Sequence, residues 1–255
     1  QVDRRHGEPA PAREREELPA EHGRADAGAT DRVHGLQGAG RDLEAGGTWL
    51  GISRGQRFAA LTNYREGAQP VATARSRGAL VADFLAGNDP PAAYLAQTAA
   101  AGAAYNGFNL FVGDHESLGY YSNRGDRRPR WLPPGIYGLS NHLLDTPWPK
   151  LASAKAAFAD ALATLPAQAA FFSLLGDQEI VADTHLPATG VPLEWERILS
   201  AAFVSSANYG TRPATLITRR RDGQTSLAER SFGAGAVAIG EVCETFQSSV
   251  ISTGV

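Results

Sequence analysis

Four polar side chains stand at the ends of segments that have the composition of β-strands. Asn63 and Arg65 close the strand-like residues 57–64, while Asp114 and Asn123 close the next two segments of this kind. An amide, a guanidinium or a carboxylate at the mouth of a sheet could contact a polar ligand, since connecting segments carry many binding groups. The alternative for each residue is a turn, because polar residues just beyond strands commonly form turns.

Cysteine and histidine offer little further chemistry. Cys243 is the single cysteine, which rules out an internal disulfide and a cysteine-based zinc site. Its place between Val242 and Glu244, in a strand-like tail, favours packing over reactivity. Six histidines occur without the spacing of metal ligands, three near the N-terminus and three in predicted loops: His6, His22, His34, His115, His142 and His185.

The composition is that of a globular protein. Of the 255 residues, 43% are hydrophobic and 20% are charged, and the formal net charge is -3. Such a charge gives no broad basic field, so we predict that the chain does not bind nucleic acid. No apolar run approaches the roughly 20 residues that span a bilayer, and no signal peptide is visible. We predict a cytoplasmic protein without a membrane span, and the sequence leaves its oligomeric state open.

The N-terminal segment differs from the rest of the chain. Residues 1–40 consist mostly of Ala, Gly, Arg, Glu and Pro, and every aromatic residue lies at or beyond Trp49. A segment of this composition buries too little apolar surface to offset the entropy of ordering it. We therefore predict a poorly ordered segment over residues 1–40 and one domain over residues 41–255.

Local signals predict a strand hairpin followed by a helical hairpin. Residues 48–53 and 57–64 have the β-branched and aromatic composition of strands, with a tight turn between them. Ser76 is expected to cap the first helix, and Gly87 to end it in a left-handed conformation. The second helix is expected over residues 90–102, because proline fits the first turn and glycine fits the position after the last.

The same signals predict more strands and a long helix later in the chain. A helix over residues 150–165 would bury one stripe of side chains, formed by Leu151, Ala154, Phe158, Leu162 and Leu165. A short helix is expected near 193–203, and strands over 108–112, 119–122, 211–220, 225–232 and 241–246. Strand pairs joined by short turns, with the helices grouped between them, predict an α+β fold of antiparallel sheets covered by helices.

A series of short blocks runs along residues 40–232. They are Gly40-Arg41-Asp42-Leu43, Gly46-Gly47-Thr48-Trp49-Leu50-Gly51, Ala60-Leu61-Thr62-Asn63-Tyr64-Arg65, Ser76-Arg77-Gly78, Gly107-Phe108-Asn109-Leu110, Gly113-Asp114, Tyr121-Ser122-Asn123, Tyr137-Gly138-Leu139-Ser140-Asn141, Asp145-Thr146-Pro147-Trp148-Pro149-Lys150 and Tyr209-Gly210-Thr211-Arg212. Each block is weak alone, but their combination and order are specific. Together they resemble the NRDE family, also called the transport and Golgi organisation family.

The resemblance implies the fold of the N-terminal-nucleophile (Ntn) hydrolases. This fold is a four-layer αββα sandwich of antiparallel sheets, in which a cysteine becomes residue one and its α-amino group, with a pKa near 8, acts as the base. The family's cysteine precedes its Asn-Arg-Asp-Glu motif, and Glu14-Arg15-Glu16-Glu17 stands about where that motif belongs. We therefore expect the nucleophile and the first strand to fall before Gln1, outside this chain.

The resemblance also assigns catalytic roles. Asn141 resembles the asparagine of the oxyanion hole in cholylglycine and penicillin V hydrolases, where a side-chain amide donates to the developing oxyanion. Its alternative role is a turn cap. Arg212 resembles the arginine that those enzymes hold beside the nucleophile, and its alternative is a surface ion pair. Asn63 is the third residue predicted to take part in catalysis.

Four further residues are predicted to contact a ligand, namely Arg65, Asp114, Asn123 and Trp148. For Trp148 the alternative is a place in the core or at its rim. The family has been linked to haem trafficking, so His115, His142 and His185 are candidate axial ligands of haem iron. Solvated loop positions are the alternative for these histidines.

Three hypotheses about function follow. The first is a protein that binds or traffics haem or an acyl-bearing small molecule. The alternative is an Ntn-type cysteine amidohydrolase that acts on linear C–N amide bonds and is inactive in this chain for want of the terminal cysteine. A third is a chain without activity of its own, in which the edge left by a missing first strand promotes aggregation.

Overall fold

The computed structural model describes residues 47–67, 71, 74–207 and 209–247, together with the backbone of 25–26, 36–39 and 41–42. The prediction of poor order over residues 1–40 therefore falls mostly outside the described residues. Two short strands are described there, β1 (Ala25–Asp26) and β2 (Leu36–Ala39). Strand β1 pairs with β3 (Arg41–Asp42), and β2 pairs with β4 (Leu50–Ser53).

The larger sheet has six strands in the order β2-β4-β5-β6-β7-β8, and every neighbouring pair is antiparallel. Its other members are β5 (Phe58–Asn63), β6 (Phe108–Gly113), β7 (Leu118–Ser122) and β8 (Arg130–Trp131). The register pairs Asn63 with Phe108 at one end of β5 and Phe58 with Gly113 at the other. This register decides which strand-end residues can share a site.

Two helices cover one face of the six-stranded sheet. They are α1 (Gly78–Ala86) and α2 (Pro91–Ala100), and the 3-10 turn η1 (Gly102–Ala104) follows them. The apolar residues of α1 and α2 pack against alternate residues of β5, β6 and β7, as the two-residue period of a strand requires. The resulting core consists of Ala59, Leu61, Leu80, Val81, Phe84, Leu85, Leu95, Tyr105, Phe108, Leu110, Val112 and Tyr121.

The smaller sheet has three antiparallel strands in the order β11-β10-β9. They are β9 (Pro213–Arg219), β10 (Gln224–Phe232) and β11 (Ala238–Gln247), and 3-10 turn η3 (Ala234–Ala236) joins the last two. Helices α3 (Pro149–Leu162) and α4 (Ala169–Leu175) pack against one face of it and form a second core around Ala161, Phe171, Phe172, Ala214, Leu216 and Ala228. The 3-10 turn η2 (Asp183–His185) and helix α5 (Leu193–Ile198) connect α4 to β9.

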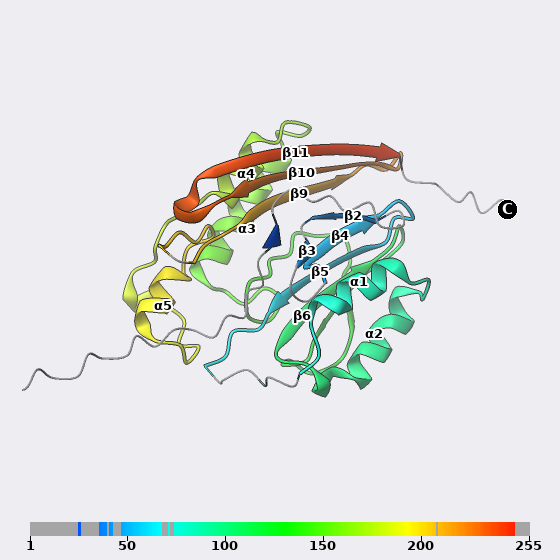
Figure 1. Cartoon of the computed structure of the whole chain (residues 1–255), viewed down its shortest axis with the longest axis horizontal. Coiled ribbons are helices and arrows are strands. Elements are labelled where there is room, and N and C mark those ends of the chain that lie inside the picture. The colour runs from blue at the N-terminus through cyan, green and yellow to red at the C-terminus, as the bar shows by residue number, and fades with distance from the viewer. Residues whose placement is uncertain are drawn as a thin grey trace, which may run out of the picture.

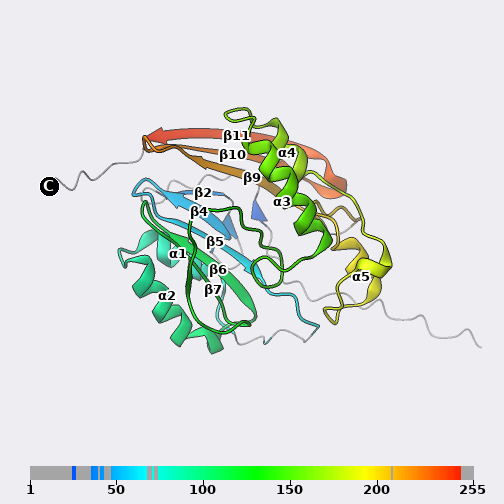
Figure 2. The same cartoon turned by 180° about the vertical axis from the view of Figure 1, so that it is seen from behind.

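Each sheet therefore has a helix pair on one face, and Figures 1 and 2 show the smaller sheet lying over the larger one. On the face of β10 away from α3 and α4, the side chains of Thr225, Leu227 and Glu229 are buried, so this face is covered as well. At one end Arg219 Nη1 donates to the Asp114 carbonyl at 2.9 Å and joins the two sheets. The predicted α+β class with antiparallel sheets is confirmed, while the specific Ntn-hydrolase topology stays a prediction.

Several local predictions are corrected. Helix α1 is preceded by Arg77, not capped by Ser76, and Gly87 is extended with φ −82°. The stripe of α3 is buried at Leu151, but Leu162, the last residue of the helix, and Leu165, which lies beyond it, are 40% and 47% exposed. Helix α4 was not expected, since its seven residues are too few to show a helical period.

Two further comparisons concern the surface. Cys243 is exposed on β11, so the prediction that it packs in the interior is wrong.

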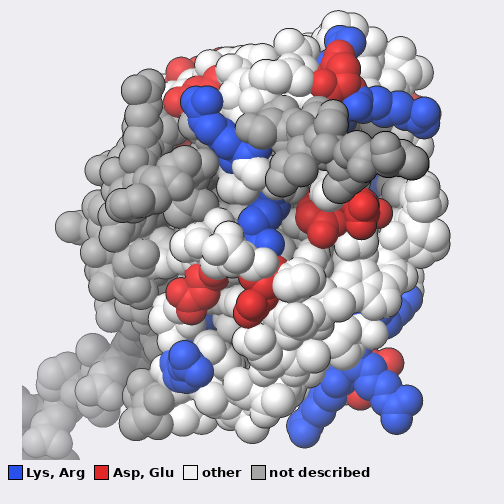
Figure 3. Space-filling model, turned by 90° about the vertical axis from the view of Figure 1, so that its right-hand side faces the viewer, with Lys and Arg blue, Asp and Glu red and all other residues white. Residues whose placement is uncertain are grey.

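Lysine, arginine, aspartate and glutamate side chains are interspersed on the face shown in Figure 3, rather than separated by the sign of their charge. None of the helices in the described part of the chain has both the length and the apolar composition needed to cross a membrane.

Candidate functional site

A short segment from the connection between β8 and α3 lies along the end of β5. Thr62 Oγ1 donates to the carbonyl of Ser140 at 2.8 Å, and Asn141 Nδ2 donates to the carbonyl of Asn63 at 3.1 Å. The backbone N–H of Arg65 donates to the carbonyl of Asn141 at 2.6 Å. The structure therefore brings together three predicted site residues that are up to 78 positions apart in the sequence.

Asn63 has an unused hydrogen-bonding group at this place. Its Oδ1 atom is buried and has no hydrogen-bond partner among the described residues. A buried amide oxygen without a partner costs about 1–3 kcal/mol, so native proteins keep few of them. Such an atom beside Asn141 is the clearest sign of a ligand-binding position in the described structure.

The ring of His142 is fixed on both sides. Its Nε2 lies 2.7 Å from the Tyr64 hydroxyl and its Nδ1 lies 2.8 Å from Thr146 Oγ1. Its carbonyl accepts a bond of 3.0 Å from Asn109 Nδ2, on the inner face of β6. Burial lowers the pKa of His142, so the neutral ring is favoured and bridges the two hydroxyls.

Arg65 and Glu196 form a buried ion pair beside this segment. Arg65 Nη1 lies 3.1 Å from Glu196 Oε2, and the two side chains are only 7% and 4% exposed. The other carboxylate oxygen of Glu196 accepts bonds from the N–H and the hydroxyl of Thr189. Burial lowers the pKa of Arg65 and the charge of Glu196 opposes this shift, so the pair connects β5 firmly to α5.

Lys150 places a second cation next to Arg65. Its Nζ donates to the carbonyl of Leu199 at 2.8 Å, and Arg65 Nη2 donates to the same carbonyl at 3.3 Å. These bonds satisfy a carbonyl just beyond the C-terminus of α5, where the helix dipole favours cations. Burial first, and then the charge of Arg65, lower the pKa of Lys150 to about 8, while Glu196 raises it.

Trp148 lies between these two cations and His142. The Arg65 guanidinium carbon is 4.9 Å from the centre of the Trp148 ring, and the His142 ring is 5.6 Å from it. Trp148 is buried, and with Arg65 and Lys150 it lines a hollow of about 10 Å³. This volume admits one water-sized group, so only a small polar part of a ligand could enter it.

Asp114 lies far from this cluster. It stands beyond the end of β6 that pairs with Phe58, whereas Asn63 pairs with the opposite end. Its Oδ1 accepts bonds from the N–H groups of Glu116 and Ser117 and from the Ser117 hydroxyl, and so closes the turn between β6 and β7. The structure gives Asp114 the role of a turn former.

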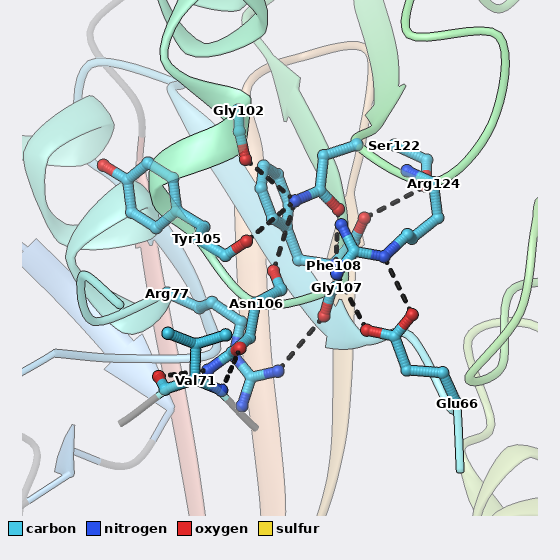
Figure 4. A network of polar contacts seen from close by, with 11 residues as sticks. Glu66, Val71, Arg77, Gly102, Tyr105, Asn106, Gly107, Phe108, Ser122 and Arg124 are labelled. Atoms are coloured by element: carbon cyan, nitrogen blue, oxygen red, sulfur yellow. Dashed lines mark hydrogen bonds and ion pairs between the residues drawn. The ribbon is translucent and has the colours of Figure 1, made fainter. Parts of the chain in front are cut away.

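Asn123 is close to Asn63 but has a different function. Its Oδ1 accepts the N–H of Phe108 at 2.9 Å, and its Nδ2 donates to the carbonyls of Gly102, Tyr105 and Asn106 at 3.0–3.3 Å. Figure 4 shows these backbone groups converging on one amide. The side chain ties the segment after α2 to β7 and has no bond left for a ligand.

Arg212 is not brought to Asn141 by any contact among the described residues. Its carbonyl accepts the N–H of Phe232 at 2.7 Å at the start of β9, and its guanidinium makes no hydrogen bond or ion pair there. Three positions earlier, Tyr209 is half-buried, and this burial raises its pKa while the nearby charge of Arg65 lowers it. The Tyr-Gly-Thr-Arg block therefore reaches the cluster through its tyrosine.

Four residues of the cluster escaped the sequence analysis: Tyr64, Lys150, Glu196 and Tyr209. The first two adjoin predicted site residues in their blocks, and this adjacency was the available signal. Glu196 gives no signal, because a glutamate in a short helix is normally solvated. In the described part of the chain, no group of His, Cys, Asp and Glu is placed to hold a metal ion.

Comparison with known proteins assigns this chain to a family. Residues 31–234 match the family described as Transport and Golgi organisation 2. The Transport and Golgi organization protein 2 homolog of Bos taurus is 42% identical over 213 residues, which are 76% of this chain and 76% of that protein. The homologues of Homo sapiens and Mus musculus are 38% and 37% identical over 212 residues, with the same coverage. The chain therefore belongs to the Transport and Golgi organisation 2 family.

Proposed function

We propose that this chain binds a small molecule with an acyl group at the Asn63–Asn141 site. The observation that carries the proposal is the buried Asn63 Oδ1, which has no partner among the described residues. A ligand N–H or O–H would donate to this oxygen. The acyl carbonyl of the same ligand would accept the second N–H of Asn141 Nδ2, whose first N–H is bound to the Asn63 carbonyl.

Charge supports an anionic group on the ligand. Arg65 and Lys150 donate to the same carbonyl, and among the described residues Glu196 pairs with Arg65 while no carboxylate pairs with Lys150. A carboxylate near this excess positive charge would be stabilised, and the effect is stronger in a buried place than in water. An N-acyl amino acid combines the amide, the carbonyl and the carboxylate that these groups would recognise.

Haem is the second candidate ligand, and the histidines bear on it. Both ring nitrogens of His142 are hydrogen bonded, so binding iron would break one of those bonds. His115 lies in the turn at the far end of β6, and its side chain is 62% exposed. His185 is exposed and lines the hollow with Trp148 and Lys150, so it could bind the iron of a haem that lies outside this small hollow.

The amidohydrolase alternative requires a nucleophile beside Asn141. The sequence has one cysteine, Cys243, and it lies on β11 in the other sheet. No contact in the described part of the chain joins it to Asn63 or Asn141. A binding function needs no such nucleophile, and the relatives are named for transport and Golgi organisation. A cytoplasmic location stays a prediction.

Calorimetric titration with N-octanoylglycine tests the proposal. We expect saturable binding that weakens about two- to tenfold in Asn63→Ala, the effect of losing one hydrogen bond. Asn106→Ala is the control, because this amide is exposed and bonds to Val71 outside the site. Absence of binding, or equal loss in both variants, would contradict the proposal.

Two further measurements separate the other functions. Haem is titrated while the Soret band is followed, and a shift that disappears in His185→Ala would favour the haem hypothesis. Mass spectrometry of the N-octanoylglycine mixture would detect free octanoate, and its release by the chain would favour the amidohydrolase. The acyl-binding proposal expects neither result.

A further inference from the structure

The outer edge of the smaller sheet has no partner strand among the described residues. In the order β11-β10-β9, strand β11 has β10 on one side and no described strand on the other, and Figure 1 shows it as the outermost strand. It is the longest strand described, Ala238–Gln247, and most of its residues are exposed. An edge strand of this length offers a row of backbone N–H and C=O groups to another extended chain.

An apolar groove lies beside this edge. Its volume is about 620 Å³, and α4, η3 and strands β9 to β11 form it. Its walls include Phe172, Phe203, Phe232 and Ile239, with Arg230 and Glu241 paired at 3.2 Å. Ile239 and the neighbouring Val237 are each 61% exposed. Large exposed apolar side chains beside a groove are typical of an interaction site.

The groove lies on one face of this edge. Arg230 and Glu241 are paired across β10 and β11 and both line the groove, so their side chains lie on its face of the sheet. Gly240 precedes Glu241 and lines the groove with its backbone. Side chains of an added strand alternate between the two faces of the sheet, so every second one would point into the groove.

The negative charge of β11 favours a positively charged binding partner. The strand carries Glu241 and Glu244 and no Lys or Arg. Arg230 pairs with Glu241, while Glu244 has no ion pair among the described residues. A second copy of β11 laid antiparallel along this edge would bring carboxylates of both copies close together, and like charges on paired strands are destabilising. A cationic segment is complementary.

We propose that β11 and the adjoining groove bind an extended segment of a partner protein that alternates basic and apolar residues. The segment adds a fourth strand to the β11-β10-β9 sheet. Backbone hydrogen bonds to β11 hold it, its apolar side chains enter the groove beside Gly240, and a basic side chain faces Glu244. Recognition of this kind draws affinity from the main chain and specificity from alternate side chains.

Fluorescence anisotropy with labelled peptides tests this surface. The probe is a decapeptide that alternates Lys and Val, and the controls are a Glu-Val decapeptide and a Lys-Val decapeptide with N-methylated backbone. We expect the first to bind, binding to weaken with added salt, and each control to bind at least about tenfold more weakly. Hydrogen exchange should slow along β11 in the complex.

Substitutions locate the site. Ala238→Trp places an indole in the groove and should weaken binding about tenfold, as loss of a buried anchor does. The matched control is Thr245→Trp, on the same face of the same strand but away from the groove, and should change the affinity less than about twofold. Equal binding of the N-methylated peptide, or unchanged affinity of Ala238→Trp, would overturn the proposal. Dimers in light scattering that Ala238→Trp abolishes would also overturn it, because a second copy would then occupy the edge.

Discussion

Two asparagines lie at one end of the six-stranded sheet and have opposite properties. Asn123 fills its hydrogen-bonding capacity with four backbone partners, whereas Asn63, paired across the ladder with Phe108, has a buried oxygen without a partner among the described residues. Both follow or end a strand, and both were predicted ligand contacts. A satisfied polar group stabilises the fold, and an unsatisfied one costs stability that a ligand could restore.

The residues around Asn123 and those around Asn63 differ in the same way. The bonds of Asn123 hold the segment after α2 against β6 and β7 (Figure 4). Near Asn63, Arg65 pairs with Glu196 while Lys150 bonds only to backbone carbonyls among the described residues, and burial together with the charge of Arg65 lowers the pKa of Lys150. We infer that the first group serves the fold and that the second serves a ligand, and four substitutions test this comparison.

The largest effect is expected for Glu196→Ala. Removing this carboxylate leaves Arg65 buried without its ion pair and should lower the free energy of unfolding by about 3–5 kcal/mol. Urea denaturation measures the change. Glu116→Ala, at a side chain that is 77% exposed, should have almost no effect. A loss similar to that of the Glu116 variant would show that the buried pair is not needed for folding.

Asn123→Ala should be nearly as destabilising. The substitution leaves the N–H of Phe108 and three carbonyls near β6 without a partner, which should cost about 3 kcal/mol. The same denaturation experiment on Asn106→Ala provides a control of the same residue type at an exposed position. If both variants lost less than about 1 kcal/mol, the structural role given to Asn123 would be wrong.

A pH dependence is expected from Lys150. Its pKa is about 8 in the folded chain, against the ordinary 10.5, so the unfolded chain binds more protons between these two values. Its contribution to stability therefore rises with pH through this window and is smallest below pH 8. The stability of the wild type relative to Lys150→Met should increase by on the order of 2 kcal/mol between pH 7.5 and 10. A flat difference would mean that Lys150 titrates normally.

The smallest change in stability is expected for Asn63→Ala. Its Oδ1 has no partner to lose among the described residues, and the backbone carbonyl that binds Asn141 remains. Stability should fall by less than about 0.5 kcal/mol or rise, because the substitution also removes the unsatisfied oxygen and its cost, while the affinity for N-octanoylglycine falls. Thermal unfolding and calorimetric titration of the same sample would measure the change in stability and the change in affinity separately. A loss as large as that of Asn123→Ala would remove the contrast between the two asparagines.

The sequence predicted most elements because their signals are local. The hairpins of β4–β5 and β9–β10 appear where turn residues interrupt β-branched segments, and Gly223 has the positive φ of 84° that such a turn needs. The predictions that Ser76 caps a helix and that Leu162 is buried were wrong, because both depend on the contacts of a helix end with neighbouring parts of the chain. Of the seven site residues predicted from the sequence, Asn63, Arg65, Asn141 and Trp148 lie together, whereas Asp114, Asn123 and Arg212 have other places or partners.

The sequence by itself determined the α+β class, the antiparallel strand pairs and the family, since these depend on short-range patterns and on the order of many short blocks. The tertiary structure alone decided which polar residues are satisfied. The register of β5 and β6 puts Asp114 at one end and Asn63 at the other. The segment after α2 supplies partners of Asn123, and α5 with the residue after it supplies partners of Arg65 and Lys150. Whether a buried polar group has a partner depends on contacts between distant residues, which no local pattern specifies.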